Sequence, residues 1–148
     1  EYAKELGADH ETLLRALTVA NLVTIHQKTS IGRLSAFCGA VSAGAGAGAG
    51  IAYLLDGSYD VIKRTIVNAL GNVSGIVCDG AKASCAAKIA ASVDAGILGY
   101  NMFIRGQEFV AGDGIVTKGV EATIVNIGRL GKDGMKGTNE EIIKMMIE

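Results

Sequence analysis

The chain has 148 residues, of which 49% are hydrophobic and 20% charged, and its formal net charge is −1. The length suits one compact domain, and the high apolar content excludes a disordered chain. The near-neutral charge argues against a nucleic-acid-binding protein, which normally carries a basic patch. The first residue is Glu1 rather than Met and no signal peptide follows, so we expect a processed chain, an isolated domain or a fragment.

The first two predicted elements are helical. Residues 9–27 combine a capping residue, Asp9, with an apolar stripe at helical spacing. Residues 34–55 carry no charge, and alanine alternates with glycine from Ala43 to Gly50. That length admits a membrane span, but the scarcity of large apolar residues favours a tightly packed central helix or helix–turn–helix. Because glycine is costly in a helix, a loop over part of this segment is an alternative.

A third helix follows a break in the apolar pattern. Either Ser58 or Asp60 can cap it, and it ends at Gly71 or Gly75. The next residues, 73–79, are short and apolar, which is compatible with a strand or a bend.

Three helices are predicted in the second half of the chain. Residues 81–99 are Ala-rich and predict a buried helix, residues 100–116 hold several glycines and predict a loop, and residues 117–130 predict a helix. Thr138 and Glu141 have the spacing of a capping box that opens a last helix. No long alternating pattern is present. We therefore expect a mainly α fold, a single compact helical domain with Gly-rich connections.

The three cysteines are Cys38, Cys78 and Cys85, an odd number that does not suit a secreted disulfide framework. The simplest interpretation is reduced, buried thiols in a cytoplasmic protein. Their spacing and the two histidines do not make a zinc site. Lys82, four residues after Cys78, suggests a second interpretation, because an ammonium group or a helix N-terminus favours the thiolate that iron–sulfur clusters require.

The segment Gly75–Ala86, with its Cys-Asp-Gly-Ala-Lys block, resembles the signature of the L-cysteine desulfidase family, which belongs with the α chain of iron–sulfur L-serine dehydratases. Similar blocks follow at 113–116, 121–130 and 134–138, and Phe37–Ala40 with the Gly/Ala run also resembles the family. The cysteine block is specific, whereas the Gly/Ala run alone is not.

The resemblance implies the C-terminal part of a longer catalytic chain, with residues 1–148 as a serine dehydratase α-chain-like domain. It also implies an oxygen-sensitive [4Fe–4S] cluster held by three cysteines, with the fourth iron open to substrate. Cys38 and Cys78 match two ligand positions. The third family ligand lies in a Gly-Cys-Thr-Glu-Pro-like segment that these residues lack. Cys85 could replace it, or could simply pack beside Cys78, nearly two helical turns away.

The implied reaction is α,β-elimination from a small L-amino acid: L-cysteine to sulfide, ammonia and pyruvate, or L-serine to ammonia and pyruvate. Lys82 is the candidate catalytic base or carboxylate-binding group, with an exposed surface lysine as the alternative. Ser42, Ser74 and Asp79 are candidate substrate-binding residues. No pyridoxal phosphate signature is evident.

The rival hypothesis is a non-enzymatic helical domain for structure or subunit interaction, with inert buried thiols. We expect a small amino acid as partner and neither nucleic acid nor a membrane, and a homo-oligomer is compatible with the sequence.

Overall fold

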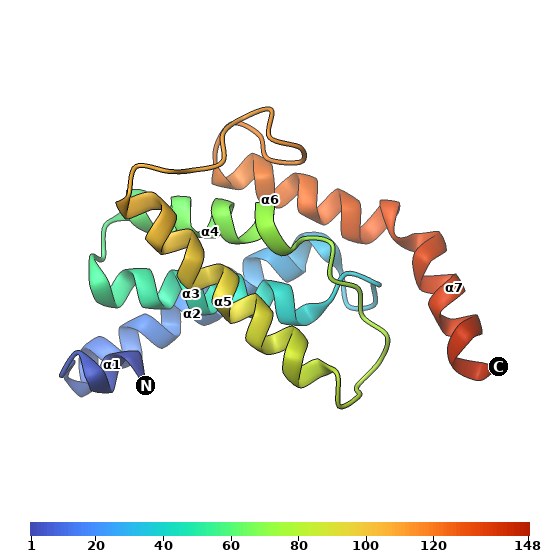
Figure 1. Cartoon of the computed structure of the whole chain (residues 1–148), viewed down its shortest axis with the longest axis horizontal. Coiled ribbons are helices and arrows are strands. Elements are labelled where there is room, and N and C mark those ends of the chain that lie inside the picture. Colours follow the sequence, from blue (N-terminus) through green and yellow to red (C-terminus); the bar gives the residue numbers. More distant parts are fainter.

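The computed structural model describes all 148 residues and is built from helices (Figure 1). The elements are α1 Tyr2–Glu5, α2 His10–Ile31, α3 Gly39–Leu55, α4 Tyr59–Val73, α5 Cys85–Ile104, α6 Val120–Arg129, the π-helical turn η1 Leu130–Gly134 and α7 Lys136–Ile147. An isolated bridge joins Phe37 to Val77, and no strand forms. The mainly α, single-domain prediction is confirmed. None of the helices is both long and apolar enough to cross a membrane.

Two predicted caps are present as expected. The Asp9 carboxylate accepts a hydrogen bond from the N–H of Thr12 at 2.8 Å, and the Ser58 hydroxyl accepts one from the N–H of Val61 at 3.3 Å. Each satisfies a backbone donor that the first turn of a helix leaves free. Ser58, rather than Asp60, is therefore the cap of α4.

The Gly/Ala run forms one unbroken helix, so the loop and helix–turn–helix alternatives are wrong. This helix, α3, packs against α2, α4 and α5. Its glycines face these neighbours: a Cβ added at Gly48 would lie 2.6 Å from the Cα of Gly96 in α5, and one added at Gly46 would lie 2.5 Å from the Ala20 carbonyl of α2. Close backbone approach on two sides stabilises a helix that glycine would otherwise weaken.

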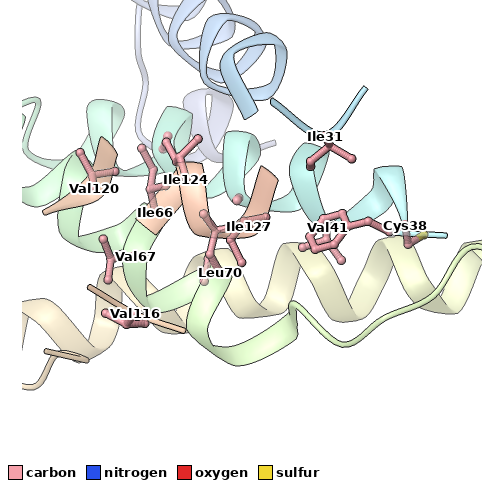
Figure 2. Close-up of a cluster of buried hydrophobic side chains, with 14 residues drawn as sticks. Ile31, Cys38, Val41, Ile66, Val67, Leu70, Val116, Val120, Ile124 and Ile127 are labelled. Carbon is pink, nitrogen blue, oxygen red and sulfur yellow. The ribbon is translucent and has the colours of Figure 1, made fainter. Parts of the chain in front are cut away.

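The large apolar side chains gather where α3, α4 and α6 meet (Figure 2). This core cluster consists of Ile31, Phe37, Cys38, Val41, Ala45, Ala49, Ile66, Val67, Ala69, Leu70, Val116, Val120, Ile124 and Ile127. Removing such side chains from water is the main favourable term in folding. The cluster lies beside the small-residue contacts of α3, and the two together hold α3 at the centre of the domain.

Several predicted boundaries are wrong: the helix predicted over residues 9–27 continues to Ile31, and the one predicted from residue 117 begins at Val120. The helix predicted from Ala81 begins at Cys85 and continues to Ile104, because residues 79–84 form the turn that leads into it. The capping box at Thr138 is also wrong, since α7 begins at Lys136. There the chain continues from α6 through the π-helical turn, so the last helix needs no new cap.

Candidate functional site

Cys38 and Cys78 lie on two backbone segments that run antiparallel and side by side. Phe37 and Val77 form the bridge between these segments. The N–H of each cysteine donates to a carbonyl of the other segment, with N···O distances of 3.1 Å for Cys38 and 2.7 Å for Cys78. Because each cysteine directly follows a bridged residue, Cys38 and Cys78 are diagonal neighbours across the paired segments. Diagonal neighbours of this kind are typically about 7–8 Å apart.

These two thiols lie at the edge of the hydrophobic core. Cys38 is 5% exposed and occupies the N-cap position of α3. Figure 2 shows it at one end of the core cluster, with Val120 at the other. Cys78 is half-buried and packs against the same cluster. The positive end of the α3 dipole therefore points to this edge, and it favours negative charge there.

Cys85 lies after the turn that follows Cys78. It is the first residue of α5, whereas Cys78 precedes the turn and lies on no helix, so the expectation of one helix carrying both is wrong. The Cys85 thiol donates to the carbonyl of Gly80 at 3.4 Å and accepts from the N–H of Lys82 at 3.5 Å. Gly80 has φ +87°, which lets the chain turn back here. The half-buried Cys85 thiol thus faces the turn that follows Cys78.

Lys88 of α5 is a functional candidate that the residue pattern did not reveal. Its ammonium donates to the carbonyl of Val77 at 3.1 Å and forms an ion pair with the Asp79 carboxylate. These two residues flank Cys78. The Lys88 side chain is 19% exposed. A sequence signal was available, because Lys88 comes three residues after Cys85 and so lies on the same side of α5.

The charges at Lys88 and Asp79 stabilise each other. The hydrogen bond to Asp79 raises the pKa of Lys88 above its ordinary value. The hydrogen bond from Lys88 holds the pKa of the Asp79 carboxyl below its ordinary value. The ammonium of Lys88 therefore remains charged beside the backbone that carries Cys78.

The lysine predicted as catalytic lies at the rim of this group. Lys82 is exposed on the turn between Cys78 and α5, and its backbone N–H contacts the Cys85 sulfur. Of the two lysines, Lys88 is the one whose ammonium contacts the cysteine-bearing backbone. The role of Lys82 as a base stays a prediction.

The three predicted substrate-binding residues occupy different environments. Asp79 lies with the cysteines, but its carboxylate is engaged by Lys88. Ser74 is the half-buried C-cap of α4, four residues before Cys78. Ser42 lies one turn after Cys38 and is fully buried, with a hydroxyl that has no hydrogen-bond partner. The structure thus brings Asp79 to the thiols and places Ser42 inside the helix packing.

The donors in this region are cysteine thiols, the kind of ligand that iron–sulfur clusters use. No three His, Cys, Asp or Glu side chains converge closely enough to hold a metal ion. Cysteine thiolates are the usual cluster ligands, and each binds a different iron, so they need to face a common space rather than one point. We call Cys38, Cys78 and Cys85, together with Lys88, the thiol site.

Two large surface cavities lie elsewhere. One of about 560 Å³ lies between α4, the residues that follow α5 and the start of α6, where its lining includes Lys63, Arg64 and Lys118. Another of about 640 Å³ is lined by residues of α6 and η1, including Asn126 and Arg129. Neither is lined by a cysteine. The thiol site is therefore separate from these two cavities.

Comparison with known proteins agrees with the residue blocks singled out in the sequence. The family profile described as serine dehydratase alpha chain matches residues 1–144. The chain therefore belongs to the serine dehydratase α-chain family, and the predicted resemblance is confirmed.

Its relatives within that family include UPF0597 proteins. The chain is 67% identical over 147 residues to the one from Desulfitobacterium hafniense, 54% to one from Lachnoclostridium phytofermentans and 50% to one from Treponema denticola. These matches cover 99% of this chain but only 34%, 35% and 34% of the relatives. The chain thus spans about a third of the length of these relatives. No solved structure matches it.

Proposed function

We propose that this chain is a catalytic domain of an iron–sulfur-dependent lyase that performs α,β-elimination on a small L-amino acid. The observation that carries the proposal is the thiol site. There the paired backbones of Cys38 and Cys78 and the first turn of α5 bring thiols, a helix N-terminus and an ammonium group together. Membership of the serine dehydratase α-chain family supports the same chemistry.

Cys38 and Cys78 are the proposed ligands of the [4Fe–4S] cluster. Cys85, whose thiol contacts the turn after Cys78, is one candidate for the third ligand. A cysteine outside these residues is the alternative. When bound, such a cluster supplies a Lewis acid for the departing thiol or hydroxyl group of the substrate.

The chain's own residues would handle charge and protons. Elimination needs a base that takes the α-proton while the leaving group departs from the β-carbon. Lys82 is the proposed base, because it extends from the turn between Cys78 and Cys85 and its exposed side chain can reach a ligand at the rim. Asp79 and Ser74 are the proposed contacts for the substrate's amino and carboxylate groups. Ser42 is the third proposed contact, and its side chain is fully buried.

Anaerobic reconstitution of the complete gene product with iron and sulfide tests this proposal. We expect the brown absorbance of a cluster, and release of sulfide from L-cysteine or of pyruvate from L-serine. Cys78→Ala should lose both absorbance and activity, whereas Ala87→Ser, an exposed change nearby on α5, should lose neither. A Cys78→Ala protein that keeps the cluster and the activity contradicts the ligand assignment.

A structural or subunit-interaction domain is the second candidate function. It is favoured by exposed apolar side chains on α2, namely Leu14, Leu17, Leu22 and Ile25, and on α7, where Ile143 and Met146 are about half exposed. Thiol reactivity and iron content of the complete protein separate the two. Inert thiols without iron under anaerobic conditions would favour the structural function.

A further inference from the structure

We propose that Lys88 is a positioning residue of the thiol site, which joins both flanks of Cys78 to the first turn of α5 and so sets the place of Cys85 relative to Cys78. The inference rests on the proposed function, because it assigns the lysine to the assembly of that same site. It goes beyond the ligands themselves and beyond Lys82.

The first argument is that different groups connect Cys38 to Cys78 and connect Cys78 to α5. Cys38 and Cys78 are held together by two backbone hydrogen bonds and the bridge between Phe37 and Val77. No backbone hydrogen bond joins residues 77–79 to α5. Beside the weak contacts of the Cys85 thiol with the turn, that connection comes from the side chain of Lys88, which binds a carbonyl on one flank of Cys78 and a carboxylate on the other.

The second argument is the register between helices. A Cβ added at Gly44 would collide with Ser92, and one added at Gly48 would collide with Gly96, so α3 and α5 run parallel in this contact. The same register, continued one turn back from Gly44 and Ser92, aligns Lys88 with the first turn of α3, which follows Cys38. Lys88 therefore joins the segment of Cys78 to α5 close to the helix that Cys38 caps.

The third argument is that Lys88 is the most buried cation among the ion pairs of the chain, ahead of Lys63 at 29% and Arg64 at 36% exposure. The Lys88 side chain is 19% exposed, whereas Arg15 and Glu11 on α2 are 64% and 72% exposed. Exposed pairs of that kind typically contribute little to stability. Burial of an ammonium that also satisfies a carbonyl makes a specific, orienting contact.

The test compares Lys88→Met, which keeps the length of the apolar stem but removes the ammonium, with Lys4→Met, a change at an exposed lysine of α1, as a control of equal charge change. Both are made in a Cys38→Ser background, which leaves two thiols because the chain has three cysteines. Phenylarsine oxide, a reagent that binds two thiols held close together, is titrated into the reduced, iron-free chain. Iron uptake on reconstitution is measured separately in the complete protein with all its cysteines.

We expect Lys88→Met to weaken phenylarsine oxide binding about tenfold or more and to lower iron uptake by over half. Lys4→Met should leave both near the parent values. Lys88→Arg keeps the charge and the donors, although its planar group fits the two acceptors less well, so it should recover part of the binding. Circular dichroism should remain that of the parent, because the helices and the core cluster do not depend on this ion pair.

Equal binding of the reagent by Lys88→Met and its parent overturns the inference, and so does a parent that binds none. Loss of helicity in Lys88→Met, which would indicate a general role in folding, also overturns it. The arsenical titration requires no iron. If the complete protein takes up no iron while the Lys88 effect persists, the proposed function fails and the positioning role of Lys88 stands.

Discussion

The contact between α3 and α5 leads to a sharp prediction at Gly44. A Cβ added there would lie 2.4 Å from both the carbonyl carbon and the carbonyl oxygen of Ser92, about 1 Å short of ordinary contact, which begins at 3.4 Å. Both partners are helix backbone, so no flexible side chain can move aside. Gly44→Ala must therefore push the two helices apart and open the adjacent contact between Gly48 and Gly96.

The expected cost follows from two opposing effects. Overpacking a tight core costs about 1–3 kcal/mol, and a clash with rigid backbone belongs at the upper end of that range. Replacing glycine by alanine in a helix contributes about 1 kcal/mol in the opposite direction. The net loss is about 2 kcal/mol, which corresponds to a fall in the unfolding midpoint of roughly 4–8 °C for a chain of this size.

Thermal unfolding followed by circular dichroism measures this loss. Gly137→Ala is the matched control, because Gly137 lies in the first turns of α7 with nothing within 4 Å of an added Cβ. The control should gain about 0.5–1 kcal/mol from its helix propensity alone. If Gly44→Ala proves as stable as the parent or more stable, the close approach of α3 and α5 is wrong.

Three further predictions concern single residues. Asn68 is buried and joins the Gly99 carbonyl to the N–H of Phe109, at 3.0 and 2.9 Å, so Asn68→Ala should cost about 2–3 kcal/mol in urea unfolding by leaving both groups unpaired. Unfolding midpoints unchanged within error would contradict this. Gly80→Ala should lose about 1 kcal/mol, because φ there is +87°, whereas Gly75→Ala, with free space around it, should lose less. The hydrogen bond from Thr12 holds the pKa of Asp9 below its ordinary 3.8, so the cap contributes stability above that pH and loses it as the pH falls through the lowered value. Asp9→Ala should therefore be less stable than the parent near pH 7, and the melting curves of these two proteins should converge in strong acid. Asp9→Asn keeps a cap that does not titrate, so its melting curve should not converge with that of Asp9→Ala.

Local signals in the sequence predicted local structure well. The caps at Asp9 and Ser58 were predictable because each side chain binds an N–H three residues later. The same reasoning failed at Thr138, where the chain arrives already helical from η1. A capping box indicates how a helix can begin, but it cannot report whether a preceding helix continues into it.

The candidate site was predictable only in part. The residue block around Cys78 and the match at Cys38 were enough to identify two cysteine-bearing segments. Lys88 was missed because its partners, Val77 and Asp79, lie across a turn whose path the sequence pattern does not specify. Cys85 was misplaced for the same reason, since its distance from Cys78 was judged along a helix that begins only at Cys85 itself.

The sequence alone determined the helical class, the family and the need for close packing along residues 43–50. These properties follow from residue type and spacing, and both are local. Tertiary structure alone decided which neighbours the glycines of α3 meet and that Lys88, rather than Lys82, contacts the backbone of Cys78. Such contacts depend on the register between helices, and that register results from the packing of the whole domain.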